Sequence, residues 1–273
     1  MSDPMADLRE AVASVPIWYH TMELAPGVVS PGWFDLRPIV DLLPWPDVRG
    51  KRCLDIGTYD GFLAFEMERR GAAEVIAIDI PDHRDWDWPP DVRAHGGENL
   101  AKIAGPEKGG GFLIAKEALG SKVERRPISV YDLTPSLMGT FDVVTCGSLL
   151  LHLRDPLRAL EAIRSICGEH FMSSEAIDIR HTVLSRRRPL LVLNGIGELC
   201  QWLTPTLEGH RRMIRAAGFQ IVKATKPYAD PYGVSHPPPG RGLRERLNLA
   251  MVRAVCGRIG VPHAAVLGRP LFP

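Results

Sequence analysis

The residues best suited to chemistry lie close together, where two aspartates bracket a glycine turn. Asp55, Gly57 and Gly61 form the pattern Asp-x-Gly-x-x-x-Gly, and Asp79 ends an apolar run further along the chain. Glycine lets the backbone pass close to a ligand, and a carboxylate about twenty residues after such a turn can accept hydrogen bonds from both hydroxyls of a ribose. This spacing therefore predicts a binding site for a ligand that contains a nucleoside.

The charge of the turn narrows the choice of ligand. The spacing differs from the Gly-x-Gly-x-x-Gly pattern that packs a dinucleotide pyrophosphate against a helix start. Asp55 would repel a pyrophosphate but suits a positively charged amino group, and S-adenosylmethionine has such a group, a ribose and no phosphate. We therefore expect S-adenosylmethionine as the cofactor. A structural turn in another α/β domain is one alternative, and a nicotinamide-dependent dehydrogenase is a further one.

The elements that must position these residues form a β-turn-α-β unit, with strands at 53–56 and 75–79 around a helix at 63–70. Runs that are apolar almost throughout indicate strands buried on both faces, which is typical of a parallel sheet. We therefore predict an α/β, Rossmann-like fold. Further strands are expected at 123–130, 141–148, 170–177, 219–224 and 263–268, and further helices at 36–43, 98–104, 112–119, 206–217, 241–259 and from Asp155-Pro156 onward.

Chain length, net charge and cysteine spacing limit the class of protein that the sequence can encode. A chain of 273 residues can bury one large core, and a net charge of +1 offers no general attraction to a polyanion, so any nucleic-acid contact would need a local patch. No apolar run approaches the length of a membrane span, and no membrane partner is expected. The five cysteines show no metal-type spacing, which favours a reduced, cytoplasmic protein; they are Cys53, Cys146, Cys167, Cys200 and Cys256.

The chain before the first strand is expected to form a cap. Residues 1–46 are assigned to an N-terminal lid or cap segment because aromatic residues between 18 and 34 lie among prolines and glycines. Trp33 and Phe34 are expected to plug the open end of the sheet. Residues 47–273 are assigned to the main domain, with insertions at about 81–111, 178–203 and 229–260.

Two charged segments allow a second interpretation that we do not favour. Asp82, His83, Asp85 and Asp87 could hold a metal, but neighbours in an extended loop rarely converge on one ion, so no metal is expected. The helix at 241–259 is expected to present its arginines to solvent rather than to a membrane or RNA. Its inward face is predicted to consist of Leu243, Leu247, Ala250, Ala254 and Val255.

Three further segments carry a resemblance to a known family. They are the run from Phe141-Asp142-Val143-Val144 to Leu151-His152-Leu153-Arg154-Asp155-Pro156-Leu157, then Trp202-Leu203-Thr204-Pro205 ahead of Gly218-Phe219, and the ending at 261–270. With the glycine turn, they resemble class I S-adenosylmethionine-dependent methyltransferases, in particular the family that contains tRNA wobble-uridine carboxymethyltransferases and many uncharacterised small-molecule enzymes. The resemblance covers about residues 15 to 270. It implies a seven-stranded, mostly parallel sheet whose last strand is antiparallel.

The resemblance also implies how the cofactor is held. We expect Asp79 to bind the ribose, Asp55 the methionine amino group and Asp132 the adenine amino group. Cys146 and Gly147 should lie beneath the methionine part. The full set of expected cofactor residues is Asp55, Gly57, Thr58, Gly61, Asp79, Ile80, Val130, Tyr131, Asp132, Cys146 and Gly147.

Whether the reaction uses general acid–base catalysis depends on the atom that is methylated. A general base accelerates methylation of a hydroxyl, whereas a thiolate or amine needs none. His152 and His20 are the candidate bases, and Glu175 could orient either. The alternatives are histidines that only pack and an ordinary carboxylate. Tyr19, Asn194 and Trp202 are the candidates for contact with the substrate.

The predicted function is methyl transfer to a small-molecule acceptor, with a hydroxyl favoured. A tRNA wobble-uridine modifier is the alternative, and an inactive cofactor-binding partner protein is a third reading. The tRNA enzymes carry a tyrosine directly before the histidine that helps hold carboxy-S-adenosylmethionine, whereas this chain has Leu151 before His152. Leucine cannot donate that hydrogen bond, which favours ordinary S-adenosylmethionine. The sequence makes no prediction of the oligomeric state.

Overall fold

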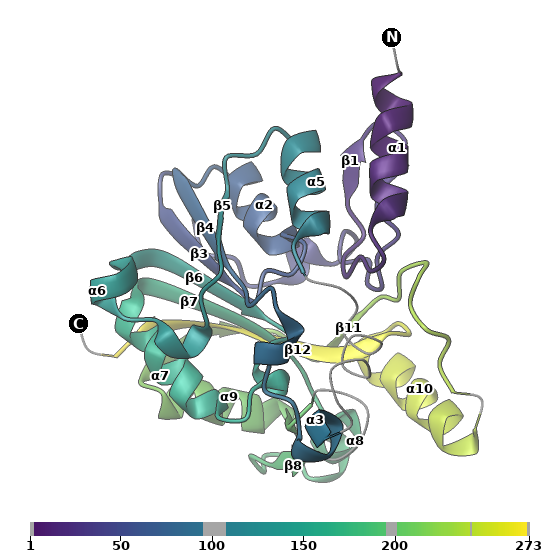
Figure 1. Ribbon diagram of the computed structural model, residues 1–273. Coiled ribbons are helices and arrows are strands. Elements are labelled where there is room, and N and C mark those ends of the chain that lie inside the picture. Colours follow the sequence, from purple (N-terminus) through teal and green to yellow (C-terminus); the bar gives the residue numbers. More distant parts are fainter. Residues whose placement is uncertain (1–2, 95–107, 195–200, 241, 272–273) are drawn as a thin grey trace.

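The computed structural model describes the whole chain except residues 1–2, 95–107, 195–200, 241 and 272–273. One sheet runs through the molecule in the order β10-β12-β7-β6-β3-β4-β5, and β11 extends it by pairing with β12 (Figure 1). The strands are β3 (Arg52–Ile56), β4 (Glu74–Ile78), β5 (Glu124–Arg126), β6 (Phe141–Gly147), β7 (Cys167–Ala176), β10 (Phe219–Ala224), β11 (Tyr228–Asp230) and β12 (Val261–Pro270).

The pairing confirms the predicted Rossmann-like sheet. β5, β4, β3, β6 and β7 follow one another in parallel, and β12 lies antiparallel between β7 and β10. The central strands are buried on both faces, as their continuous apolar runs require. Because parallel strands end at one edge of a sheet, the residues that follow β3, β4 and β6 meet there.

Helices cover both faces of the sheet. α2 (Phe62–Arg69) and α5 (Gly110–Ala118) lie on one face, and α7 (Pro156–Ile166) and α9 (Leu207–Ala216) lie on the other (Figure 1). α7 begins where the sequence predicts, because the Asp155 side chain accepts a hydrogen bond from the amide of Arg158 and Pro156 occupies the first turn. α6 (Pro135–Met138) is a single short turn before β6.

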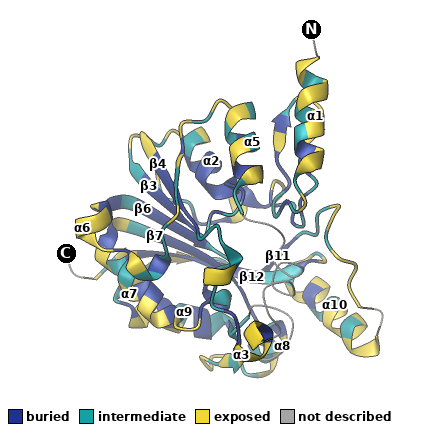
Figure 2. Ribbon diagram, viewed as in Figure 1, coloured by how far each residue is buried: buried dark blue, intermediate teal, exposed yellow. Residues whose placement is uncertain are grey.

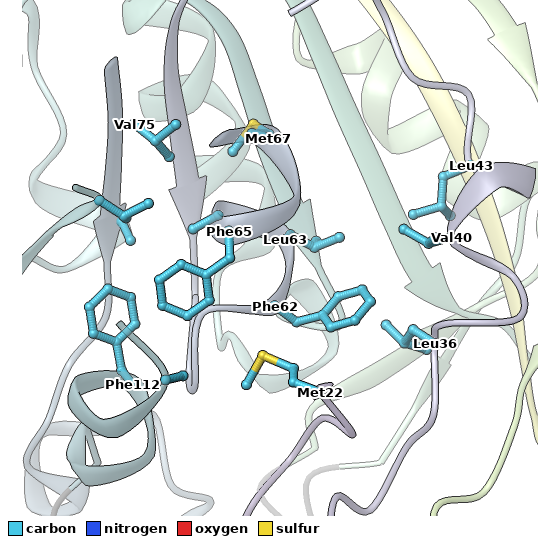
Figure 3. Close-up of a cluster of buried hydrophobic side chains, with 14 of the residues drawn as sticks. Met22, Leu36, Val40, Leu43, Phe62, Leu63, Phe65, Met67, Val75 and Phe112 are labelled. Atoms are coloured by element: carbon cyan, nitrogen blue, oxygen red, sulfur yellow. The ribbon is translucent and has the colours of Figure 1, made fainter. Parts of the chain in front are cut away.

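The N-terminal segment shares a hydrophobic cluster with α2 and α5. It contains α1 (Pro4–Ser14) and the small hairpin of β1 (Glu23–Ala25) and β2 (Val28–Val29). Figure 3 shows Met22 and Leu36 of this segment beside Phe62 of α2. Burial of these side chains fixes the N-terminal segment against the same layer that carries the glycine turn.

Several element boundaries differ from the predictions. Only a 3-10 turn, η1 (Val40–Leu42), forms where a helix at 36–43 is predicted, because Pro38 restricts the residue before it and cannot donate a backbone hydrogen bond. β5 stops at Arg126 for the same reason, since Pro127 follows it, and η3 (Val130–Asp132) replaces the end of the predicted strand. The predicted helix at 98–104 lies outside the described residues.

Two of the three segments predicted as insertions, those at about 81–111 and 178–203, contain short helices or strands. Residues 178–203 include α8 (Ile179–Leu184), which the Asp178 side chain caps, and β8 (Leu191–Leu193), which pairs with β9 (Leu203–Pro205). The segment after β4 contains η2 (His83–Asp85) and α3 (Pro90–Ala94), and η4 (Leu150–His152) follows β6. In the described ranges, no helix is long and apolar enough to cross a membrane.

The predicted inward face of the C-terminal helix was wrong. Much of α10 (Leu243–Cys256) is exposed (Figure 2). Its buried residue is Val252, whereas Leu243, Leu247, Ala250, Ala254 and Val255 are exposed. The helix carries apolar residues on two opposite sides, and periodicity alone cannot tell which of two apolar sides faces the core.

Candidate active site

Two adjoining cavities lie at the edge where β3, β4 and β6 end. The large cavity has a volume of about 260 Å³, and the small cavity has a volume of about 30 Å³. Tyr19, His20, Gly57, Gly147 and Ser148 line both cavities. The large cavity also brings together five further residues singled out from the sequence: Asp79, Ile80, Val130, Tyr131 and His152.

Asp79 is held rigidly at the large cavity. Its Oδ2 accepts a hydrogen bond from the amide of Tyr59 (2.8 Å), and its Oδ1 accepts one from the amide of Ile80 (2.8 Å). Lys108 Nζ lies 3.3 Å from Oδ1 and 3.9 Å from the ring centroid of Trp86. The carboxylate is therefore oriented in advance, within a wall of aromatic rings.

The glycine turn allows the close approach that the sequence predicts. Gly57 and Gly61 have φ angles of +73° and +96°, in the left-handed region. A Cβ at Gly61 would lie 2.4 Å from Phe65, so this glycine lets the turn pack on α2. Gly57 lines both cavities, whereas Gly61 does not line either.

Asp55 lies at the small cavity together with Thr58. The carboxylate is 2% exposed, and its Oδ1 accepts a hydrogen bond from Thr145 Oγ1 (2.7 Å). Burial raises the pKa of Asp55 to about 6, so the group is mainly ionised at neutral pH and its charge is poorly hydrated. Such a carboxylate favours a cationic group in the adjoining space.

A histidine–carboxylate pair stands where the two cavities meet. His20 Nδ1 lies 2.5 Å from Asp60 Oδ1. Asp60 Oδ2 accepts hydrogen bonds from the amides of Tyr19 (2.9 Å) and His20 (2.7 Å), and the imidazole stacks on Phe62 at 5.2 Å between centroids. Donation from Nδ1 to Asp60 leaves Nε2 as the basic nitrogen of the ring.

Asp60 is a candidate site residue that the sequence analysis missed. It lies inside the glycine turn and is 1% exposed. The sequence did contain a signal for Asp60, because it is a second acidic residue near the glycine turn in addition to Asp55. Its partner, His20, is 40 residues away in the chain, so no local pattern connects the two.

Glu175 orders the turn that carries the other candidate base. Glu175 is 1% exposed, and its Oε1 accepts hydrogen bonds from the amides of Leu149 (3.3 Å) and Leu150 (3.2 Å). Burial raises the pKa of Glu175 to about 8. His152 belongs to the same turn, η4, and lines the large cavity.

A third histidine, not expected from the sequence, lies behind Ser148. His263 Nε2 is 2.8 Å from Ser148 Oγ and 3.2 Å from Asp230 Oδ2, and Nδ1 donates to the carbonyl of Val261 at 2.9 Å. Ser148 has a φ angle of +50° at the end of β6. The cluster therefore fixes an unusual backbone conformation at the point where both cavities meet.

Besides Gly61 and Glu175, four predicted residues line neither cavity. Asp132 is exposed, Cys146 is buried, and neither lines a cavity. Trp202 Nε1 donates to the carbonyl of Asp87 (2.5 Å), and Asn194 Nδ2 donates to Thr204 Oγ1 (3.0 Å). Trp202 thus supports the segment that lines the large cavity, and direct contact of these four residues with ligands stays a prediction.

The acidic segment after β4 is occupied by contacts within the protein. Asp82 pairs with Arg84, and Asp87 Oδ2 accepts hydrogen bonds from Tyr131 Oη (2.6 Å) and the amide of Arg154 (2.9 Å). Across the described ranges, no three potential metal-ligating side chains converge. Trp86 and Trp88 of this segment stack at 5.5 Å and line the large cavity.

The sheet order, the glycine turn at the end of β3 and the acid at the end of β4 define a class I S-adenosylmethionine-dependent methyltransferase. Comparison with a family model agrees, since residues 35–224 match the methyltransferase domain family. The chain therefore belongs to the methyltransferase domain family.

Two curated relatives are similar to part of the chain. The ubiquinone biosynthesis O-methyltransferase of Acinetobacter baumannii is 31% identical over 147 residues, which are 49% of this chain and 52% of the relative. That of Chromobacterium violaceum is 29% identical over 181 residues, 64% of this chain and 66% of the relative. The chain thus spans about half to two thirds of the length of these curated relatives.

Two solved structures share the fold at low sequence identity. The N-terminal domain of EvdMO1 with bound S-adenosylhomocysteine has a TM-score of 0.55 and 15% identity, covering 99% of this chain and 98% of that one. The 1,6-didemethyltoxoflavin-N1-methyltransferase of Burkholderia thailandensis has a TM-score of 0.51 and 16% identity, covering 87% and 78%.

Proposed function

We propose that the protein transfers a methyl group from S-adenosylmethionine to a hydroxyl of a small, largely apolar molecule. The observation that carries the proposal is the His20–Asp60 pair at the junction of the two cavities. The relatives that are named as O-methyltransferases are consistent with an oxygen acceptor.

The cofactor fits across both cavities. Asp79 would accept the ribose hydroxyls, with Ile80 and Val130 against the adenine. The methionine part would pass Gly57, and its ammonium would lie near the buried carboxylate of Asp55. The cofactor supplies a methyl group that is already activated on a sulfonium, so the protein needs to orient the acceptor and exclude water.

His20 would act as the general base. Its Nε2 accepts the proton of the acceptor hydroxyl while the oxygen forms its bond to the methyl carbon and the carbon–sulfur bond breaks. Asp60 holds the ring through Nδ1 and stabilises the imidazolium that results. A positioned base typically contributes about 10²–10⁴-fold to such a reaction.

The walls of the large cavity favour an apolar, ring-bearing acceptor. Trp33, Trp86 and Trp88 line the cavity beside Tyr19 and Tyr131. Aromatic side chains bury flat apolar groups well, and their polar tips allow a few oriented hydrogen bonds. A small-molecule acceptor is therefore preferred over tRNA, for which a net charge of +1 provides no general attraction.

Two measurements test the proposal in sequence. Calorimetry with S-adenosylmethionine and S-adenosylhomocysteine should show binding, and failure to bind either would overturn the cofactor assignment. Transfer of labelled methyl to a panel of phenols, alcohols, amines and thiols should label hydroxyl compounds. Labelling of bulk tRNA but of no small molecule, or of amines alone, would contradict the acceptor.

A further inference from the structure

One side of α10 is apolar and uncovered. Leu243 and Leu247 are 73% and 60% exposed, and Ala250 and Ala254 are exposed as well. These four positions follow one another by four, three and four residues, which places them in a single stripe along the helix. We refer to these four residues as the outer stripe.

The opposite side of α10 attaches the helix to the protein. Val252 is 1% exposed and packs in a cluster with Ile177, Ile179, Ala229 and Ala264. Met251 and Cys256 pack against the same cluster. The outer stripe therefore contributes nothing to this core, although a helix that faces only water would carry polar residues there.

Arginines border the outer stripe on both sides. On a helical wheel, Arg246 and Arg253 follow one edge and Arg244 follows the other, and all three are exposed. Glu245 is the acidic residue of α10 and lies on the side toward the protein. An apolar stripe between basic residues is typical of helices that lie in the surface of an anionic membrane.

We propose that α10 binds the surface of an anionic phospholipid bilayer. The outer stripe enters the boundary between headgroups and acyl chains, and the bordering arginines contact lipid phosphates. Charge complementarity selects this occupant over a second copy of the chain. Two outer stripes packed together would bring the arginines of both copies close to one another, without an acidic partner on the same side of the helix.

Cosedimentation with lipid vesicles tests the proposal on the full chain. We expect binding to vesicles of equal parts phosphatidylcholine and phosphatidylglycerol, and at least tenfold weaker binding to phosphatidylcholine alone. A basic residue near an anionic surface contributes about fivefold to such binding, so added salt should weaken it.

Variants separate the apolar from the electrostatic contribution. Leu243→Glu with Leu247→Glu should abolish binding to both kinds of vesicle, whereas Arg246→Gln with Arg253→Gln should weaken binding to the anionic vesicles alone. Leu137→Glu is the matched control, because Leu137 is an equally accessible leucine (54% exposed) on α6, and it should bind as the unaltered protein does.

Two results would overturn the proposal. The first is absence of binding to either vesicle composition by the unaltered protein. The second is a dimer, measured by light scattering, that the Leu243→Glu, Leu247→Glu variant converts to a monomer, because the stripe would then belong to an interface between copies. Thermal unfolding and calorimetry of the cofactor check that each variant remains folded.

Discussion

The two sides of the large cavity are built in different ways. The motif side, which includes Gly57, Asp79 and Ile80, comes from one continuous β-turn-α-β unit, and its main contacts are backbone amides bound to Asp79. The opposite side, which we call the lid side, includes His20 of the N-terminal segment and Ser148 after β6. It depends on side-chain pairs between distant segments, His20 with Asp60 of the glycine turn and Ser148 with His263.

The difference predicts which variants affect binding and which affect chemistry. A site made by a continuous turn keeps its geometry as long as that turn folds. A site made by side-chain pairs loses its geometry when one partner is removed, even though the rest of the fold remains. Variants on the lid side should therefore reduce turnover, and variants on the motif side should reduce cofactor affinity.

The largest expected effect is the loss of turnover in His20→Ala. Removal of the base should lower kcat by about 10²–10⁴-fold, while cofactor affinity changes by only a few fold. Labelled-methyl transfer measures the first and calorimetry the second. His181→Ala is the matched control, because His181 also pairs with an aspartate but lies on α8 away from the cavities, and it should keep full activity.

Asp60→Asn sharpens the same test by changing only the partner of the ring. We expect a smaller fall in kcat than for His20→Ala, since the imidazole remains as a base but loses the carboxylate that orients its ring. Equal activity of Asp60→Asn and the unaltered protein would show that the pair only supports the lid, and would break the distinction between the two sides.

The next effect concerns cofactor affinity on the motif side. Asp79→Ala should weaken binding of S-adenosylhomocysteine by about 10–100-fold, as expected for hydrogen bonds to a charged group. Asp82→Ala is the control, since Asp82 pairs with the exposed Arg84 and does not line a cavity. If Asp79→Ala bound the product normally but lost turnover, the assignment of the ribose to this side would be wrong.

The sequence predicted most of the fold because its strands are continuous apolar runs with recognisable ends. The predicted helix at 36–43 and the predicted end of β5 were wrong for local reasons. Pro38 lies within the predicted helix and Pro127 directly follows β5, and the sequence analysis did not take either proline into account. The inward side of α10 was wrong because both sides of that helix are apolar, and only the contacts of Val252 decide between them.

The two sides of the large cavity also differ in how well their residues could be predicted from the sequence. The turn and Asp79 could be recognised because their spacing is a local property of one unit. Asp60 and His263 could not be recognised in this way. Each contacts a partner more than thirty residues away in the chain, and the spacing of residues in the sequence does not show such a contact. His20 and His152 were identified by residue type, and their environment became known only from the structure.

A smaller effect is expected at the buried carboxylate of the motif side. Because burial raises the pKa of Asp55 to about 6, the stability that the protonated group provides is lost as the pH rises through that value. Asp55→Asn keeps an acceptor for Thr145 and should be more stable than the unaltered protein at pH 7.5, while it binds the cofactor about tenfold more weakly. Thermal unfolding and calorimetry measure the two changes, and a gain in cofactor affinity would contradict the proposed ammonium contact.

The last expected effect concerns only the pH dependence of stability and involves Glu175 beside the lid side. Its folded pKa of about 8 lies above the unfolded value, so the native state binds the proton more strongly, and stability falls as the pH rises from about 4.5 to 8. Glu175→Gln keeps the acceptor for the amides of Leu149 and Leu150 but has no charge to bury. The variant should be close to the unaltered protein near pH 5 and exceed its stability by roughly 4 kcal/mol near pH 8.5. A constant difference in unfolding temperature between the variant and the unaltered protein across this range would show that Glu175 stays ionised in the folded protein. Glu175 would then resemble Asp55, which is mainly ionised at neutral pH.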